Sequence, residues 1–283
     1  DQDEQALQQV LQRAKSQRVP TMTQLVDLIA INELLGTVES SGDGKNANLV
    51  AQLETESLAA KAAEFKTTNN DDTIGWIRIP NTNVDYPVVY KAGVENYAYY
   101  ESKGYDKQYS KDGVIWADYE CTFPELSQNT TLYGHNWHNI YTPRTQANMQ
   151  ANDLMFSLVM SYNYTDFAQE NPFVYFSTTE QDYVFQVFAS YYTDLNFGYN
   201  YAQMSQEDFQ KVIAEAKAKS LSNYNVPVTS EDKIVTLSTC TRVHGNTNNQ
   251  RFVVMAKLVP VGTPSTTIST HSNPIAYNSS IDA

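Results

Sequence analysis

The chain has 283 residues, enough for one large domain or two small ones, and 41% of them are apolar, an ordinary share for a globular protein. Its formal net charge of −13 repels nucleic acid and anionic lipid, and it holds no block rich in lysine and arginine, so we expect no nucleic-acid site. The sequence contains no run of 18 apolar residues that would span a bilayer, and its two cysteines are fewer than a disulfide-stapled secreted domain usually carries.

The sequence begins at Asp1 without a signal peptide, so we expect a processed or truncated product from which a leader or anchor has been removed. Residues 1–68 are expected to form a helical region. Apolar side chains recur at helical spacing in residues 7–14 and 23–35, and residues 49–65 are rich in Ala, Glu, Gln and Leu. This region is interpreted as an appendage that packs on the main domain, with a lid or spacer as the alternative.

From Asn69 the pattern changes to short segments rich in β-branched and aromatic residues, which are separated by polar turns. Eight strands are predicted, at residues 74–79, 84–89, 113–117, 129–133, 173–177, 183–192, 233–239 and 251–259. Eight short strands favour a small closed β-barrel over a parallel sheet. We therefore expect a mainly β domain over residues 69–261.

Two helices are predicted between these strands, at residues 147–160 and 206–220. The second has one apolar face, and Ser205 with Asp208 at its start resembles a capping box. The end of the chain, residues 262–283, is rich in Ser and Thr and has little to bury, so a loose tail or spacer is expected there.

Cys240 is the first candidate for chemistry, because it ends a predicted strand that holds it rigidly and lets it face a cleft. A cysteine nucleophile reacts as the thiolate and needs a basic or cationic neighbour. Taken alone, a cysteine at a strand end is more often structural. Cys121 is interpreted as structural, and no disulfide between Cys121 and Cys240 is expected.

His135 is the favoured proton carrier, because it directly follows a predicted strand and is preceded by Gly134, which permits a close backbone approach. His138 lies three residues further on. His244 follows Cys240 closely and is the main rival as base, whereas His271 lies in the expected tail.

Arg251 begins the last predicted strand, where its guanidinium could donate several hydrogen bonds to a developing oxyanion or to a peptide carbonyl. Arg242, two residues beyond Cys240, is the alternative cation. Other chemistries lack their signatures, since the sequence has no CxxC, HExxH, P-loop or GxSxG motif and no zinc-ligand spacing. We therefore expect neither a metal nor another cofactor.

At these strand ends the chain resembles the sortase family of cysteine transpeptidases. The similarity is carried by Thr-Leu-Ser-Thr-Cys at residues 236–240, Leu-Tyr-Gly-His-Asn at 132–136 and Arg-Phe-Val-Val at 251–254, and it also covers residues 74–80, 84–89 and 112–118. Among the classes it looks most like class B. A helix precedes the cysteine strand, helices precede the barrel, and the Asp-Pro-aromatic lid motif of the pilin-assembling class C enzymes is missing.

The resemblance implies an eight-stranded sortase barrel in which Cys240 attacks the carbonyl after a threonine of a C-terminal sorting motif. His135 would protonate the leaving amine, Arg251 would hold the substrate or the oxyanion, and the thioacyl-enzyme would pass its acyl group to an amine. The same resemblance implies substrate contacts for Thr239, Ser238 and Asn96.

The partners implied are surface or pilin proteins that carry a sorting motif, NPxTG-like rather than LPxTG, and an amine of peptidoglycan or of a pilin lysine. The implied place is the outer face of a Gram-positive membrane or its cell wall, with membrane contact only through an anchor that this sequence lacks. Two alternatives stay open: a hydrolytic cysteine protease, in which water replaces the amine, and a non-enzymatic adhesin or pilus component.

Overall fold

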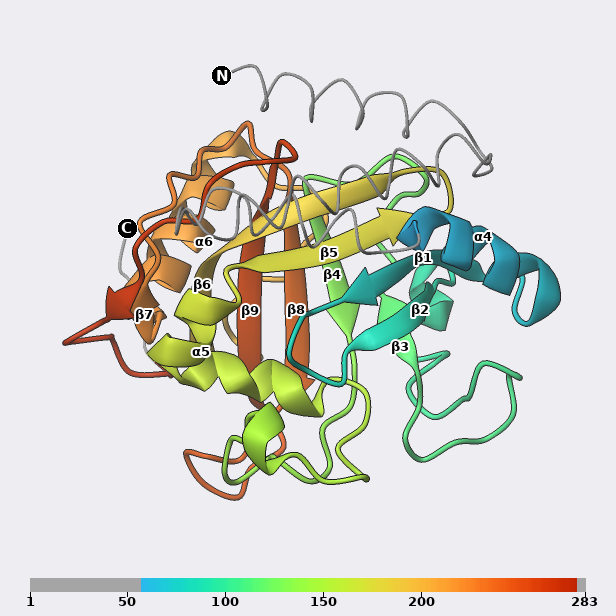
Figure 1. Ribbon diagram of the computed structural model, residues 1–283, viewed down its shortest axis with the longest axis horizontal. Coiled ribbons are helices and arrows are strands. Elements are labelled where there is room, and N and C mark those ends of the chain that lie inside the picture. Colours follow the sequence, from blue (N-terminus) through green and yellow to red (C-terminus); the bar gives the residue numbers. More distant parts are fainter. Residues whose placement is uncertain (1–56, 279–283) are drawn as a thin grey trace, which may run out of the picture. The chain divides into compact units, whose positions relative to one another are not determined.

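Eight strands close into a barrel of mixed pairing in the computed structural model, which describes residues 57–278 (Figure 1). The barrel order is β1-β2-β3-β4-β8-β9-β6-β5, in which β2/β3 and β4/β8 are parallel and the other pairs are antiparallel. Its strands are β1 (Thr73–Arg78), β2 (Asp85–Val89), β3 (Ile115–Ala117), β4 (Asn129–Tyr133), β5 (Phe173–Thr178), β6 (Asp182–Asp194), β8 (Ile234–Cys240) and β9 (Gln250–Val259). Each of the eight predicted strands overlaps one of these, and the prediction of a closed, mainly β barrel is confirmed.

Helix α4 (Leu58–Thr68) precedes the barrel and overlaps the end of the helix predicted at residues 49–65. The Ser57 hydroxyl caps it by accepting from the Ala60 N–H, and it also donates to Asp182 at the start of β6. Leu58, Ala59 and Ala62 form its buried side. The helices predicted further upstream in residues 1–56 lie outside the described residues, and the proposed division of the chain at residues 68 and 261 stays a prediction.

The helix predicted at residues 147–160 is wrong. The segment consists of two 3₁₀ helices, η3 (Gln146–Asn148) and η4 (Ser157–Asn163), and α5 (Thr165–Glu170) follows. Polar side chains satisfy the backbone N–H groups here. Asn148 accepts from the Thr145 N–H, and Asp153, which also pairs with Arg144, accepts from the Gln150 N–H. Such local acceptors compete with a continuous α-helix.

Helix α6 (Gln206–Lys219) confirms the second predicted helix. The Ser205 side chain accepts from the Asp208 N–H, two acidic residues lie in the first turn, and two lysines lie in the last, as the helix dipole favours. Among residues 57–278, none of the helices is both long enough and apolar enough to cross a bilayer.

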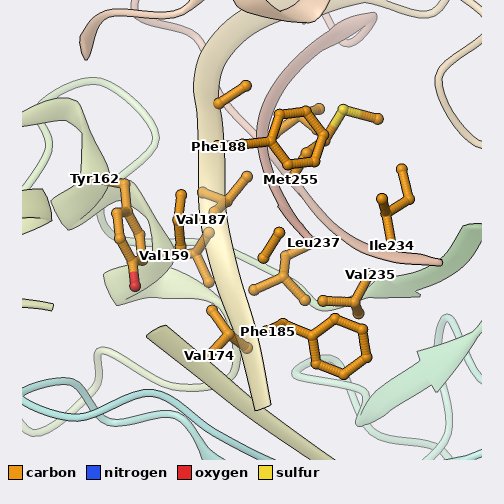
Figure 2. Packing of buried hydrophobic residues seen from close by; sticks show 14 of the residues in the cluster. Val159, Tyr162, Val174, Phe185, Val187, Phe188, Ile234, Val235, Leu237 and Met255 are labelled. Carbon is orange, nitrogen blue, oxygen red and sulfur yellow. The ribbon is translucent and has the colours of Figure 1, made fainter. Parts of the chain in front are cut away.

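Inward-facing side chains fill the barrel, and Figure 2 shows part of this core. Leu237 of β8 lies opposite Leu132 of β4 and Val254 of β9, and all three are fully buried. Val159 and Tyr162 of η4 lie beside Val187 of β6 in the same view. Because Leu237 points inward and side chains alternate along a strand, its two neighbours in β8 point outward.

The expectation of a loose tail is wrong for the described part of the chain end. A short strand, β10 (Ser269–Thr270), pairs with β7 (Ser222–Asn223), which directly follows α6. Ile268 is 7% exposed. Backbone pairing, which its Ser/Thr-rich composition does not reveal, fixes this segment in place. Residues 57–261 and 265–278 belong to one compact unit.

Candidate active site

Strands β4, β8 and β9 are neighbours in the barrel (Figure 1). The three candidate residues lie at the same edge of these strands. Strands β4 and β8 are parallel, so both end at this edge, and the antiparallel β9 begins there. Cys240 is the last residue of β8 and His135 follows β4 by two residues. Arg251 is the second residue of β9.

The strand register places these residues level with one another. Cys240 and Arg251 are direct cross-strand partners, so their side chains leave the sheet on the same face. Tyr133 pairs with Ser238, and the Gly134 N–H donates to the Ser238 carbonyl at 3.4 Å. Extending that parallel register by two residues beyond the Tyr133–Ser238 pair brings His135 level with Cys240, on the outer face of the barrel.

The segment that carries His135 is tied to the cysteine strand by two further hydrogen bonds. The Thr239 hydroxyl donates to the Gly134 carbonyl at 2.7 Å, and the Asn136 amide donates to the Cys240 carbonyl at 3.2 Å. The Asn136 side chain also accepts from the Asn139 N–H. Residues on both sides of His135 are therefore fixed to β8, which limits movement of the imidazole relative to the thiol.

The imidazole of His135 is held in a cage of aromatic rings and backbone. It stacks on Trp137, with ring centroids 5.0 Å apart and 27° between the planes, and Trp116 lies 5.8 Å away. Its Nε2 lies 2.5 Å from the Glu101 carbonyl oxygen. A carbonyl only accepts, so Nε2 carries a proton in this contact, and Nδ1 is the nitrogen left to exchange one.

Gly113 makes this arrangement possible. Its φ of +60° lies in the left-handed region, and a Cβ added there would lie 2.9 Å from His135 Cδ2 and 3.0 Å from the Glu101 carbonyl oxygen. Only a residue without Cβ leaves this space to the imidazole. The long connection between β2 and β3, residues 90–114, thus forms one side of the histidine site.

Arg251 is positioned by the loop that joins β8 to β9, residues 241–249. Its Nη1 donates to the carbonyls of Asn248 and Gln250, both at 2.9 Å. Within residues 57–278, Nε and Nη2 have no hydrogen-bond partner, which leaves donors for a ligand. Arg242, the alternative cation, donates to the Asn248 side chain at 2.6 Å and so helps to close the same loop.

Ser238 precedes Cys240 by two residues and so lies on the same face of β8, and it is 1% exposed. Its hydroxyl bonds Tyr199 Oη at 2.8 Å, and burial is the main cause that raises the pKa of this tyrosine. The Asn129 amide of β4 donates to the Tyr199 carbonyl, which pins the connection between β6 and α6 against the outer face of the barrel. Ser238 therefore anchors this connection.

The remaining candidates lie in other surroundings. Asn96 belongs to η2 (Val94–Asn96), where its amide donates to the Ala92 carbonyl. His138 contacts Asn152, and His244 packs between Tyr192 and Tyr277. The expected absence of a disulfide is confirmed, because both cysteines are free. Burial raises the pKa of the Cys121 thiol to about 12, in keeping with a structural role.

Sequence reasoning missed several groups around His135 and Cys240. The Glu101 contact uses a backbone carbonyl, which no residue type signals, and Tyr199 reaches Ser238 from 39 positions away. Trp137 had a weak signal, because it follows His135 by two residues after a strand. Within the described residues, no group of three or more His, Cys, Asp or Glu side chains is arranged to hold a metal ion.

Comparison with known proteins identifies the fold around this site. The family model described as the sortase domain matches residues 77–259, which include all three candidate residues. The chain belongs to the sortase family. It is 30% identical to sortase B of Staphylococcus aureus over 193 residues, which is 68% of this chain and 72% of that protein.

Solved structures agree with this assignment. The complex of Staphylococcus aureus sortase B with its substrate superimposes with a TM-score of 0.60 at 27% identity, covering 77% of this chain and 92% of the other. A sortase B complexed with triglycine gives a TM-score of 0.58 at 27% identity, covering 77% and 93%. This sortase is therefore a cysteine transpeptidase, and it is most similar to class B.

Proposed function

We propose that this sortase cleaves a C-terminal sorting motif after its threonine and transfers the new carboxyl end to an amine, with Cys240 as nucleophile, His135 as acid and base, and Arg251 as oxyanion donor. The observation that carries the proposal is the strand register, which pairs Cys240 directly with Arg251 and brings His135 level with it. A cysteine, an imidazole and a guanidinium on one face meet the needs of acyl transfer.

In the first half-reaction the Cys240 thiolate attacks the threonine carbonyl and forms a C–S bond. The C–N bond then breaks, and His135 gives its Nδ1 proton to the leaving amine while Nε2 stays bonded to the Glu101 carbonyl. The Nε and Nη2 atoms of Arg251, which have no hydrogen-bond partner among residues 57–278, stabilise the negative charge on the carbonyl oxygen.

In the second half-reaction the acceptor amine attacks the thioacyl carbon. Nδ1 of His135 takes a proton from this amine, the new C–N bond forms, and the C–S bond breaks to restore the thiolate. The solved sortase B complexed with triglycine supports a glycine-type amine of peptidoglycan as the acceptor, ahead of a pilin lysine. From the similarity to sortase B we also infer an NPxTG-like motif and a place at the outer face of a Gram-positive membrane.

The substrate contacts expected for Thr239, Ser238 and Asn96 stay predictions, and for the first two residues we propose a positioning role instead. The hydroxyls of Thr239 and Ser238 are bonded within the protein, so we assign both residues to positioning of the segments around Cys240. The Asn96 amide bonds within its own 3₁₀ turn and would have to exchange that bond for one to the substrate.

The proposal is tested with peptides that carry NPxTG-like or LPxTG motifs, incubated with and without triglycine and a lysine amine, and followed by mass spectrometry. Cys240→Ala is expected to abolish the thioacyl adduct, and His135→Ala and Arg251→Ala to lower turnover by about 100-fold or more. Cys121→Ala is the matched control and should retain activity, and Arg242→Ala, which removes only a contact within the 241–249 loop, should lose much less turnover than Arg251→Ala.

Three outcomes contradict parts of the proposal. Products that never change when an amine is added would favour the hydrolytic protease. Loss of turnover in Arg242→Ala with retention in Arg251→Ala would move the oxyanion role to Arg242. A thiol probe that does not label Cys240, together with the absence of any sorting-peptide-dependent adduct, would favour a non-enzymatic surface protein.

A further inference from the structure

The loop between β8 and β9, residues 241–249, joins the proposed nucleophile to the proposed oxyanion donor, so its shape sets their relative position. On one side it is tied to Ile140, whose carbonyl accepts from the Arg242 N–H at 2.6 Å and from the Thr241 hydroxyl at 3.1 Å. On the other side, the backbone N–H of His244 donates to the Gln250 side chain at 3.1 Å.

His244 is an exposed residue, and the end of the chain supplies one of its two ring contacts. The Tyr277 ring stacks on the His244 imidazole with centroids 4.7 Å apart and 11° between the planes. The imidazole also makes a T-shaped contact with Tyr192 in β6, with centroids 4.7 Å apart and 85° between the planes. His244 is therefore held between the barrel and the chain end by two aromatic contacts.

Tyr277 can act as a clamp because the segment before it is anchored along α6 and β7. Going toward the chain end, the His271 N–H donates to the Leu221 carbonyl at 2.9 Å and the Ile275 N–H to the Ala218 carbonyl at 3.0 Å. Nδ1 of His271 bonds the Ser220 carbonyl at 2.7 Å. Strand β10 pairs with β7 just before these contacts.

A buried lysine holds the backbone next to Tyr277 in place. Lys219 at the end of α6 is 2% exposed, and its ammonium donates to the carbonyls of Ala276 and Tyr277 at 3.2 and 3.0 Å. The same ammonium pairs with Glu215 at 3.4 Å and lies 5.7 Å from the centre of the Phe197 ring. It thus connects the chain end to α6 and to the connection between β6 and α6.

We propose that residues 265–277 form a strap that holds the 241–249 loop in its active shape, with Tyr277 as a positioning residue that acts through His244. The strap lies beyond residue 259, where the match to the sortase domain ends. The proposal rests on the proposed roles of Cys240 and Arg251, because the loop matters through the residues at its two ends.

The stacked contact predicts a specific pattern of kinetic change. Tyr277→Ala in the full chain should lower kcat of acyl transfer by about 5- to 10-fold, in line with the loss of one aromatic pair, and leave KM for the sorting peptide within about 2-fold. Tyr277→Phe keeps the ring and should restore kcat. Hydrogen exchange of residues 241–249, measured without substrate, should speed up in Tyr277→Ala and return to the wild-type rate in Tyr277→Phe.

A second pair of variants tests the same contact from the loop. His244→Phe keeps a flat ring between Tyr192 and Tyr277 and should retain kcat and its pH profile, whereas His244→Ala should resemble Tyr277→Ala. Loss of activity in His244→Phe with a changed pH profile would instead make His244 a proton carrier and overturn the strap's role. This pair also serves if Tyr277→Ala does not fold.

Other outcomes are equally decisive. Unchanged exchange and kcat in Tyr277→Ala would overturn the proposal, as would an equal loss in Tyr277→Phe, since stacking would then not be the cause. Because exchange is measured without substrate, a wild-type protein that transfers no acyl group would count against the proposed function alone and leave the strap to be judged by exchange.

Discussion

At the scale of single residues, the site depends on how one imidazole is confined. His135 is stacked on Trp137 and bonded through Nε2 to the Glu101 carbonyl. It also lies so close to Gly113 that no Cβ would fit between them. Each contact fixes a different property: the plane of the ring, its tautomer, and its distance from the β2–β3 connection. Effective proton transfer needs such fixed geometry, because errors near 1 Å cost large factors in rate.

Substitution of Gly113 tests this confinement. Gly113→Ala should push the imidazole away and lower kcat by about 10- to 100-fold, with KM for the sorting peptide nearly unchanged. Gly93→Ala is the matched control, because Gly93 also has a positive φ, of +96°, but the atoms nearest to its added Cβ belong to the flexible Glu95 side chain. An equal loss of kcat in both variants would attribute the effect to backbone strain in the connection.

At the scale of elements, the β2–β3 connection must itself be held in place to present Glu101 and Gly113. Asp72, in the turn before β1, does this by accepting from the Tyr100 hydroxyl at 2.6 Å and pairing with Lys91 and Lys107, both at 3.1 Å. Burial opposes ionisation of Asp72, but these three donors outweigh it and hold the pKa of the carboxyl below its usual value.

The lowered pKa of Asp72 predicts a pH dependence of stability. A carboxyl whose folded pKa lies below its unfolded value stabilises the protein at neutral pH, and this contribution is lost as pH falls below about 4 and through the folded pKa. Asp72→Asn should lower the free energy of unfolding at pH 7 by about 1–2 kcal/mol and flatten its decline in acid. Urea titrations between about pH 3 and 7 measure both effects.

Asp71→Asn provides the control for this prediction. Asp71 pairs with the same Lys107, but its side chain is 82% exposed. The variant should therefore behave like the wild type across this pH range. A wild-type decline in acid that Asp72→Asn leaves unchanged would show that other carboxyls cause it.

At the scale of the whole molecule, closure of the barrel is what brings the three chemical groups together. The parallel pair β4/β8 joins strands separated by about a hundred residues, and the chain between them supplies η4, α5, β5, β6 and α6. The inward faces of these strands share one core, so the active edge and the core depend on the same closure.

Leu237 gives a test of this dependence, because it lies at the centre of the core on the cysteine strand and is fully buried. Leu237→Ala should lower the free energy of unfolding by about 2–5 kcal/mol without changing the denaturant slope. Leu195→Ala, at a position 58% exposed, should change it by no more than about 0.5 kcal/mol. A small effect at Leu237 would mean that the barrel core is not cooperative.

The sequence alone determined the eight barrel strands, helix α6, and the candidates Cys240, His135 and Arg251. Those predictions rest on local periodicity and on a motif at each strand end, and both are features of short, continuous stretches of sequence. The helix predicted at residues 147–160 failed because Asn148 and Asp153 satisfy backbone groups locally, an effect that apolar spacing does not register.

Only the tertiary structure decided the register between strands, the cage around His135 and the packing of residues 265–278. Each depends on backbone carbonyls or on ring contacts between distant segments, such as Glu101 with His135 and Tyr277 with His244. Every residue has a backbone carbonyl, and the presence of an aromatic residue does not indicate which distant ring it contacts. These contacts therefore leave no pattern in the sequence. They exist because closure of the barrel and pairing of β10 with β7 bring those segments together.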